Sequence, residues 1–149
     1  MQPDDPADPL PRPFILPRSA LFGFKTIDHE HQELVDIVNG AIEDFRRLGR
    51  REAAHFEPWI RKLRERMVHH FAHEEREMRH AGFDGVAAHI THHTQLIERL
   101  NHMLAHIGHT AAVDIEALFE LFAQVMDDIL RADLPFKDYL AANGLIAPD

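Results

Sequence analysis

Apolar residues recur along most of this chain at alternating spacings of three and four positions, the pattern of a helix with one buried face. No stretch shows the strict alternation of a half-buried strand. Four such stripes follow one another: Ile27, His31, Leu34, Val38, Ala41, Phe45 and Leu48; then Ile60, Leu63, Met67, His70, Glu74 and Met78; then Val86, His89, His93, Leu96, Leu100, Met103 and Ile107; then Ile115, Leu118, Phe122, Val125 and Ile129. The pattern predicts four helices that share one core.

Glycine and proline indicate where these helices end. Gly49, Gly82 and Gly108 each follow a stripe, at the position where a helix C-terminus favours glycine, and Pro135 should end or kink the fourth helix. The connections are therefore short, and short connections between neighbouring helices favour an antiparallel arrangement. We predict an all-α fold, an antiparallel, up-down-up-down four-helix bundle.

The N-terminal segment has a different composition. Five of the first thirteen residues are proline, interspersed with aspartate, which excludes a regular helix. A chain of 149 residues supports one well-formed core and is short for two. We therefore expect an extended Pro/Asp-rich arm over residues 1–20 and the bundle over residues 21–149.

Charge and composition exclude several functional classes. The formal net charge is −9, and the acidic residues are spread along the chain, so no basic surface for nucleic acid is expected. The N-terminus lacks the pattern of a secretory signal, and no run of eighteen apolar residues predicts a membrane span. With no cysteine, disulfides, thiolate metal sites and iron–sulfur clusters are excluded. We expect a cytoplasmic protein that binds neither nucleic acid nor membrane.

Several of the thirteen histidines interrupt the apolar stripes. His70 with Glu74, and His89 with His93, are each four residues apart, so each pair projects from one face of a helix. A buried ionisable group is costly unless it is paired or bound to a metal ion. Donors with this spacing are suited to binding one metal centre.

The register of antiparallel helices tests whether these interruptions meet in space. In such a hairpin, facing residues have numbers that sum to about twice the number at the midpoint of the turn. The predicted turns lie near residues 50, 81 and 110. The pairs that satisfy this arithmetic are His31 with His70, Glu74 with His89, His93 with Asp128, and His89 with Asp133. Histidines and carboxylates from all four helices should therefore lie in one layer.

The donor types limit the metal. Imidazole nitrogen and carboxylate oxygen without thiolate suit iron, manganese or zinc, and two carboxylates among several histidines indicate two bridged metal ions. A ferritin-like site requires Glu-x-x-His on two different helices, whereas Glu52/His55 and Glu77/His80 both belong to the region of the second helix. A zincin requires His-Glu-x-x-His, which this chain lacks.

Four segments of the chain together resemble the ordered motifs of bacterial hemerythrins, the family of bacteriohemerythrins and hemerythrin-like domains. They are Ile27-Asp28-His29-Glu30-His31, His70-Phe71-Ala72-His73-Glu74-Glu75, His89-Ile90-Thr91-His92-His93 and Asp128-Ile129-Leu130-Arg131-Ala132-Asp133. The resemblance spans about residues 21 to 140. It implies a non-haem centre of two iron ions (Fe2+/Fe3+), bridged by carboxylates and by an oxo or hydroxo group.

The resemblance also implies a role for each ligand. The positions it assigns are His31 and His70 on the iron that receives dioxygen, His89 and His93 on the other iron, and Glu74 and Asp133 as bridges. One position departs from the family, whose last motif reads His-x-x-x-x-Asp, because the place of that histidine is taken by Asp128. Asp128 either ligates the second iron as a carboxylate, which favours the ferric state, or pairs with Arg131 and leaves that iron weakly held.

By this resemblance we expect reversible dioxygen binding, for storage, delivery or sensing, with no catalytic residue. The first alternative is a redox enzyme that turns over peroxide or nitric oxide at the same centre, and Asp128 is the feature that raises it. The second alternative is an iron-binding, iron-storage or structural bundle whose site is weakly occupied or holds zinc. The sequence identifies no protein partner.

Overall fold

A computed structural model describes residues 12–48 and 52–146 of the chain. Its elements are η1 (Arg18–Ala20), α1 (Lys25–Leu48), α2 (Ala53–Ala81), α3 (Val86–Ile107), α4 (Ile115–Asp127), the π-helical turn η2 (Asp128–Ala132) and α5 (Leu134–Ala142). The predicted all-helical class with four long helices is confirmed. In the described residues, no helix combines the length and the apolar character needed to cross a membrane.

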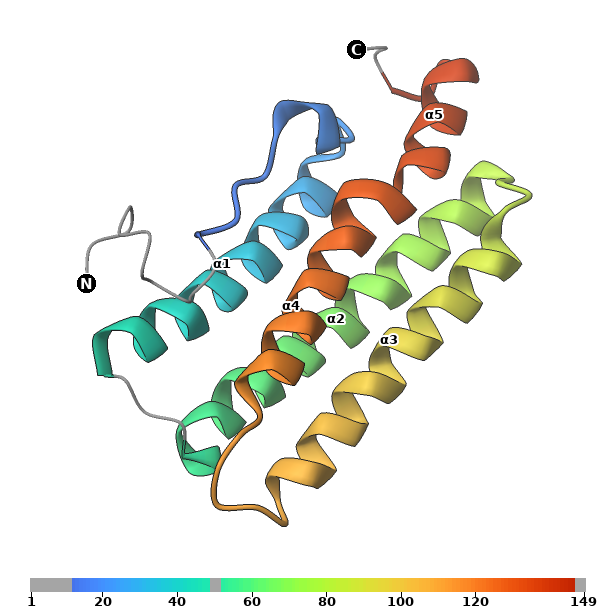
Figure 1. Cartoon of the computed structure of the whole chain (residues 1–149). Coiled ribbons are helices and arrows are strands. Elements are labelled where there is room, and N and C mark those ends of the chain that lie inside the picture. The colour runs from blue at the N-terminus through green and yellow to red at the C-terminus, as the bar shows by residue number, and fades with distance from the viewer. Residues whose placement is uncertain (1–11, 49–51, 147–149) are drawn as a thin grey trace.

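Consecutive long helices lie side by side and run in alternating directions (Figure 1). Contacts between α1 and α2 join rising residue numbers on one helix to falling numbers on the other, since Glu30 contacts His70 and Asp44 contacts Trp59. The corresponding pairs between α2 and α3 are Glu75 with His93 and Arg64 with Asn101. This register sets the polar positions near the start of the α1 stripe beside those near the end of the α2 stripe, and the latter beside those near the start of the α3 stripe.

Two apolar clusters lie on either side of the polar layer. The larger cluster draws buried side chains from α1, α2, α3 and α4. The smaller cluster, toward the start of α1 and the end of α2, consists of Phe22, Ile27, Met78, Phe136 and Leu140. Along the chain, the histidines and carboxylates of the stripes fall between residues of the two clusters, so the polar layer is enclosed by hydrocarbon from both directions.

The helix ends follow the expected chemistry in part. Gly82 ends α2 in the left-handed region, with φ of 72°, a conformation that glycine adopts without strain. Gly108 follows α3, whereas the predicted cap Gly49 lies outside the described residues. The fourth helix does end before Pro135, and α5 begins in its place with that proline in the first turn.

Part of the predicted arm packs against the bundle. Residues 1–11 lie outside the described part, and residues 12–17 form no regular element. The backbone of Phe14 makes two hydrogen bonds with the side-chain amide of Asn39, both 2.8 Å long. Further on, the buried Lys137 of α5 donates from Nζ to the carbonyl oxygen of Ser19 at 2.6 Å. Residues 14–19 are therefore tied to α1 and α5.

Candidate metal centre

The structure brings six of the seven candidate ligands into one layer. They form two overlapping groups in which the donor atoms all lie within 4.8 Å of one another. The first group is His31, His70, Glu74 and Asp133, and the second is Glu74, His89, His93 and Asp133. We call His31 and His70 the inner pair, and His89 and His93 the outer pair. Glu74 and Asp133 belong to both groups.

The inner pair is fully enclosed. The Nε2 atoms of His31 and His70 lie 3.0 Å apart. The Oε2 atom of Glu74 is 3.0 Å from His70 Nε2 and 3.6 Å from His31 Nε2, and the Oδ2 atom of Asp133 is 3.1 Å from His31 Nε2. None of these four residues is more than 1% exposed. Their donor atoms therefore face one another in a space closed to solvent.

The outer pair uses the other oxygen of each shared carboxylate. His89 Nε2 lies 2.8 Å from both Glu74 Oε1 and Asp133 Oδ1, and His93 Nε2 lies 3.7 Å from Glu74 Oε1. Each carboxylate thus directs one oxygen toward the inner pair and its second oxygen toward the outer pair. Two carboxylates in this arrangement can bridge a pair of metal ions.

The turn η2 explains how Asp128 and Asp133 both face this layer. In an α-helix, residues five apart point in directions that differ by about 140°. In η2, the backbone N–H of Asp133 donates to the carbonyl of Asp128 at 3.1 Å, an i to i+5 bond that widens the turn. Both aspartates are consequently buried, at 1% and 0% exposure.

Asp128, the seventh candidate ligand, belongs to neither four-residue group and lies beside the outer pair. Its Oδ1 atom is 3.8 Å from His93 Nε2 and 3.0 Å from His92 Nε2. The alternative in which Asp128 pairs with Arg131 is wrong, because Arg131 points outward and contacts Asp127 at 3.3 Å. The wider turn of η2 directs Asp128 inward, away from the exposed arginine.

In each pair, one histidine contacts a glutamate through the ring nitrogen that faces away from the layer. His70 Nδ1 lies 3.0 Å from Glu30 Oε1, and His93 Nδ1 lies 2.8 Å from Glu75 Oε1. A neutral imidazole that donates its Nδ1–H to a carboxylate keeps a lone pair on Nε2, the atom that faces the layer here. The ring of His93 also stacks on Phe71, with centroids 3.6 Å apart and planes within 5°.

Glu30 is absent from the set of residues that the sequence analysis singled out as ligands. It lies off the apolar stripe of α1, yet it is only 8% exposed and contacts the Nδ1 atoms of both His70 and His73, at 3.0 and 2.9 Å. The register that pairs His31 with His70 also places residue 30 opposite this part of α2. That register is the signal by which Glu30 was identifiable.

Buried donor atoms without hydrogen-bond partners show that the residues present fit metal ions. In the described part of the chain, Glu74 Oε2, His93 Nε2 and both carboxylate oxygens of Asp133 have no such partner. Leaving buried polar atoms unpaired is costly, and few are tolerated in a native protein. These atoms converge on the same space without being aligned for bonds to one another. Nitrogen and carboxylate donors in this arrangement suit two ions of the iron, manganese or zinc type.

The same carboxylates perturb three of the histidines. Burial disfavours the charged form of each ring, but the carboxylates that lie beside it outweigh that effect. The resulting pKa is raised to about 9 for His31, to about 10 for His70 and to about 10 for His89. These rings therefore carry protons at neutral pH when no cation is bound beside them.

The pKa values of His93, Asp133 and Glu74 shift for different reasons. Burial lowers the pKa of His93 to about 3, which keeps this ring neutral. Burial, with the nearby charges of Glu74 and Asp128, raises the pKa of Asp133 to about 7. The pKa of Glu74 stays well below its usual value, because three histidines outweigh the effect of burial. A metal ion must displace the protons of His31, His70 and His89.

The surroundings of the two pairs differ. The ring of Phe22 meets His31 edge-on at 5.6 Å, and Met78 and Phe136, in the same apolar cluster as Phe22, have no exposed surface. Beside the outer pair, a surface groove of about 430 Å³ reaches His93, with Phe71 and Glu75 among its lining residues. The inner pair is sealed from solvent, whereas the outer pair lies close to the solvent.

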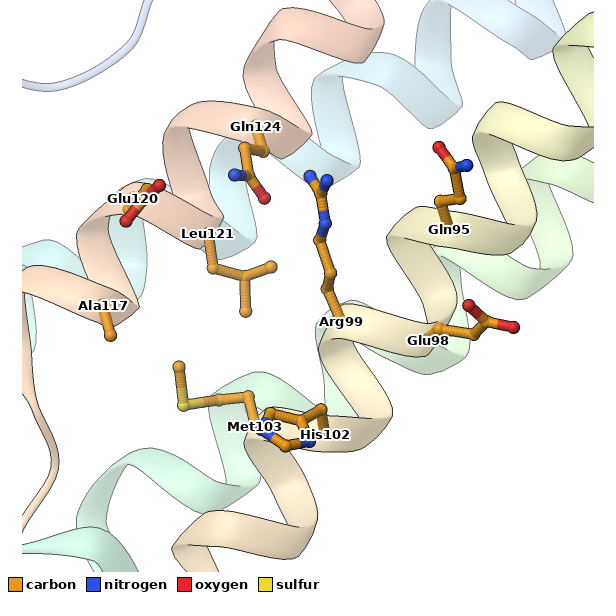
Figure 2. Close-up of a pocket in the computed structure, with 9 residues that line it drawn as sticks. All are labelled: Gln95, Glu98, Arg99, His102, Met103, Ala117, Glu120, Leu121 and Gln124. Carbon is orange, nitrogen blue, oxygen red and sulfur yellow. The ribbon is translucent and has the colours of Figure 1, made fainter.

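A second groove, of about 650 Å³, lies between α3 and α4 and contains none of the candidate ligands (Figure 2). Arg99 extends from α3 toward Gln124 of α4, and Leu121 and Met103 supply an apolar part of the lining. The groups of side chains that could hold a metal ion, as found among the described residues, include no residue of this groove.

The comparisons with known proteins do not identify a family for this chain. A scan against protein-family models and a search of the curated proteins each found no match to the chain. The feature that indicates a function is therefore the buried cluster of histidine, glutamate and aspartate side chains, which can hold metal ions.

Proposed function

We propose that this chain is a hemerythrin-like, antiparallel four-helix bundle that holds two iron ions and binds dioxygen reversibly. One observation carries the proposal: Glu74 and Asp133 each direct one oxygen to the inner pair and the other oxygen to the outer pair. A donor set of imidazole and carboxylate, with no thiolate, suits iron in both of its common oxidation states.

The residues divide between the two ions as follows. The ligands that would hold the dioxygen-binding iron are His31 and His70, those of the other iron are His89 and His93, and Glu74 and Asp133 would bridge them. When bound, the two irons supply the electrons for reversible dioxygen binding. Storage, delivery and sensing all use this property, and we place the activity in the cytoplasm, a compartment that suits a chain without cysteine.

The chain itself orients the ligands and excludes water. Glu30 and Glu75 set the ring orientation of His70 and His93 from outside the layer. The ring of Phe22 meets His31 edge-on, and Met78 and Phe136 belong to the same buried apolar cluster, so water and protons reach the inner pair poorly. An apolar shell of this kind controls solvent access to a metal centre and favours a reversible reaction there.

A second candidate is a redox enzyme that turns over peroxide or nitric oxide at the same centre. The observation that favours it is Asp128, which is 1% exposed and adds a third carboxylate beside the outer pair. An additional negative charge near the outer iron stabilises the ferric state and speeds irreversible oxidation of the diferrous centre.

Anaerobic reconstitution with Fe2+ tests both candidates. The metal content per chain is counted, and the visible spectrum is recorded as air is admitted and then removed. About two irons per chain, with an absorption band that appears with air and fades on deoxygenation, is the result expected for the dioxygen binder. A diferric product that never releases dioxygen, together with consumption of peroxide or nitric oxide when a reductant is supplied, selects the enzyme. Binding of one iron or none, or a preference for zinc, overturns both.

A further inference from the structure

His92 is a half-exposed residue with a buried donor atom. It lies on α3, one residue before His93 and off the predicted apolar stripe. Its side chain is 37% exposed, yet its Nε2 atom is buried and has no hydrogen-bond partner in the described part of the chain. That atom lies 3.0 Å from Asp128 Oδ1, which is also buried and without a hydrogen-bond partner there.

The same combination occurs at a shared carboxylate of the proposed metal centre. Both oxygens of Asp133 lack a hydrogen-bond partner in the described residues, although they lie 3.1 Å from His31 Nε2 and 2.8 Å from His89 Nε2. Adjacent ligands of one ion, at bond lengths of about 2.1 Å, are about 3 Å apart and point at the ion and not at each other. The contact between His92 and Asp128 has this character.

Helix geometry explains why His92 reaches this place. His89, His92 and His93 are spaced i, i+3 and i+4, so the three rings leave α3 on neighbouring faces. The turn η2 presents Asp128 to the same side, with its Oδ1 atom 3.8 Å from His93 Nε2. Asp128 Oδ1 therefore lies within 4 Å of the Nε2 atoms of both His92 and His93.

We propose that His92 and Asp128 are ligands of the outer metal ion, together with His93. This inference rests on the proposed function, because it adds ligands to the same centre. It replaces the single histidine of the family pattern, whose place is taken by Asp128, with a histidine from the neighbouring helix and a carboxylate. Neither His92 nor Asp128 belongs to the groups of donor atoms that lie within 4.8 Å of one another. The proposal therefore requires the ring of His92 to move inward when the ion binds.

Anaerobic titration with Fe2+ of the full chain tests this assignment. We compare wild type, His92→Ala, His92→Gln and, as the matched control, His102→Ala, which removes an exposed histidine of the same helix. Wild type and the control should bind two ions. Both His92 variants should keep the first ion and bind the second at least about tenfold more weakly. X-ray absorption at the iron edge should show fewer nitrogen ligands in both.

The variants separate a ligand from a mere partner of Asp128. Glutamine donates a hydrogen bond to a carboxylate but is a poor iron ligand, so recovery of wild-type affinity in His92→Gln overturns the proposal. Equal binding of two ions by wild type and His92→Ala also overturns it, while the proposed function stands. Fewer than two ions in wild type itself is instead a failure of the proposed function. Thermal melting of each metal-free variant shows that it is folded, and the near-isosteric glutamine keeps the test valid if alanine is not tolerated.

Discussion

The inner and outer pairs have the same kinds of ligand but different surroundings. Each consists of two histidines that share Glu74 and Asp133. The inner histidines are at most 1% exposed, and the ring of Phe22 packs edge-on against His31. On the outer side, His89 is 8% exposed and a groove of about 430 Å³ reaches His93. The difference between the two halves therefore comes from what packs around the ligands.

Under the proposed function, one layer of donors serves two purposes. A sealed apolar environment suits a small uncharged ligand and excludes the water that promotes irreversible oxidation. An environment close to solvent suits the entry of metal ions and the tuning of their charge by groups such as Asp128 and His92. We accordingly expect the outer ion to exchange faster than the inner ion, and the following changes break or sharpen that contrast.

Removal of a shared carboxylate should abolish the difference between the inner and outer ions, because it weakens the binding of both. Glu74→Ala should reduce the metal content from about two ions to less than one, because both pairs lose a ligand. It also leaves buried imidazolium groups without a partner, so the free energy of unfolding of the metal-free chain should fall by about 3–5 kcal/mol. Elemental analysis and denaturant titration measure the two effects. Glu65→Ala, an exposed change on the same helix, is the control, and retention of two ions by Glu74→Ala contradicts the bridging role.

The number of protons released on metal binding should also differ between the two pairs. His31 and His70, with pKa values of about 9 and 10, both lose protons when the inner ion binds. In the outer pair, His89 releases one proton and His93, with a pKa of about 3, releases none. Since binding expels protons, affinity rises with pH, by roughly a hundredfold per pH unit for the inner ion and tenfold for the outer ion.

This prediction is checked near pH 8, where Asp133, with a pKa of about 7, is mostly ionised and adds little. Metal ions are added to the metal-free protein in weak buffer, and the protons released per ion are measured by back-titration. We expect about two protons with the tighter ion and about one with the weaker ion. Equal release in the two steps is the result that contradicts the assignment.

Removing Glu30 or Glu75, the glutamates that contact His70 and His93 from outside the layer, should affect one of the two metal ions at a time. Glu30→Ala should weaken the inner ion and Glu75→Ala the outer ion, each within the range of about 10–100-fold that is typical when the partner of a ligating histidine is lost. The larger effect is expected for Glu30, because it is more buried and contacts two histidines. Chelator competition gives the stepwise dissociation constants. If both variants weaken the same ion, the division into two pairs is wrong.

A smaller change should open the inner half. Phe22→Leu keeps an apolar side chain but removes the ring that meets His31, and should lower the free energy of unfolding by about 1 kcal/mol. Removal of metal by a chelator should be biphasic in wild type, and only the slow phase should accelerate, by several-fold. Phe24→Leu, at a partly buried ring of the same N-terminal segment, provides the comparison. An unchanged slow phase in Phe22→Leu shows that Phe22 does not limit access.

Much of the fold and of the site follows from the linear pattern. The stripes predict the four long helices, and the register arithmetic places His31, His70, Glu74, His89 and Asp133 at one height because the rise of a helix is constant. Periodicity is less informative at helix ends, where no neighbouring helix covers the stripe. Leu48, the last position of the first stripe, is accordingly 41% exposed.

The sequence by itself determined the helices, the donor types and their common height, since these depend on spacing along a regular helix. Only the tertiary structure decided which oxygen of Glu74 and Asp133 faces which pair, and that Asp128 contacts His92 and not Arg131. These outcomes depend on side-chain torsions and on the widened turn η2, a local change in helix pitch that residue spacing does not encode. The charges of the site belong with them, because each pKa follows from burial and from neighbours on other helices.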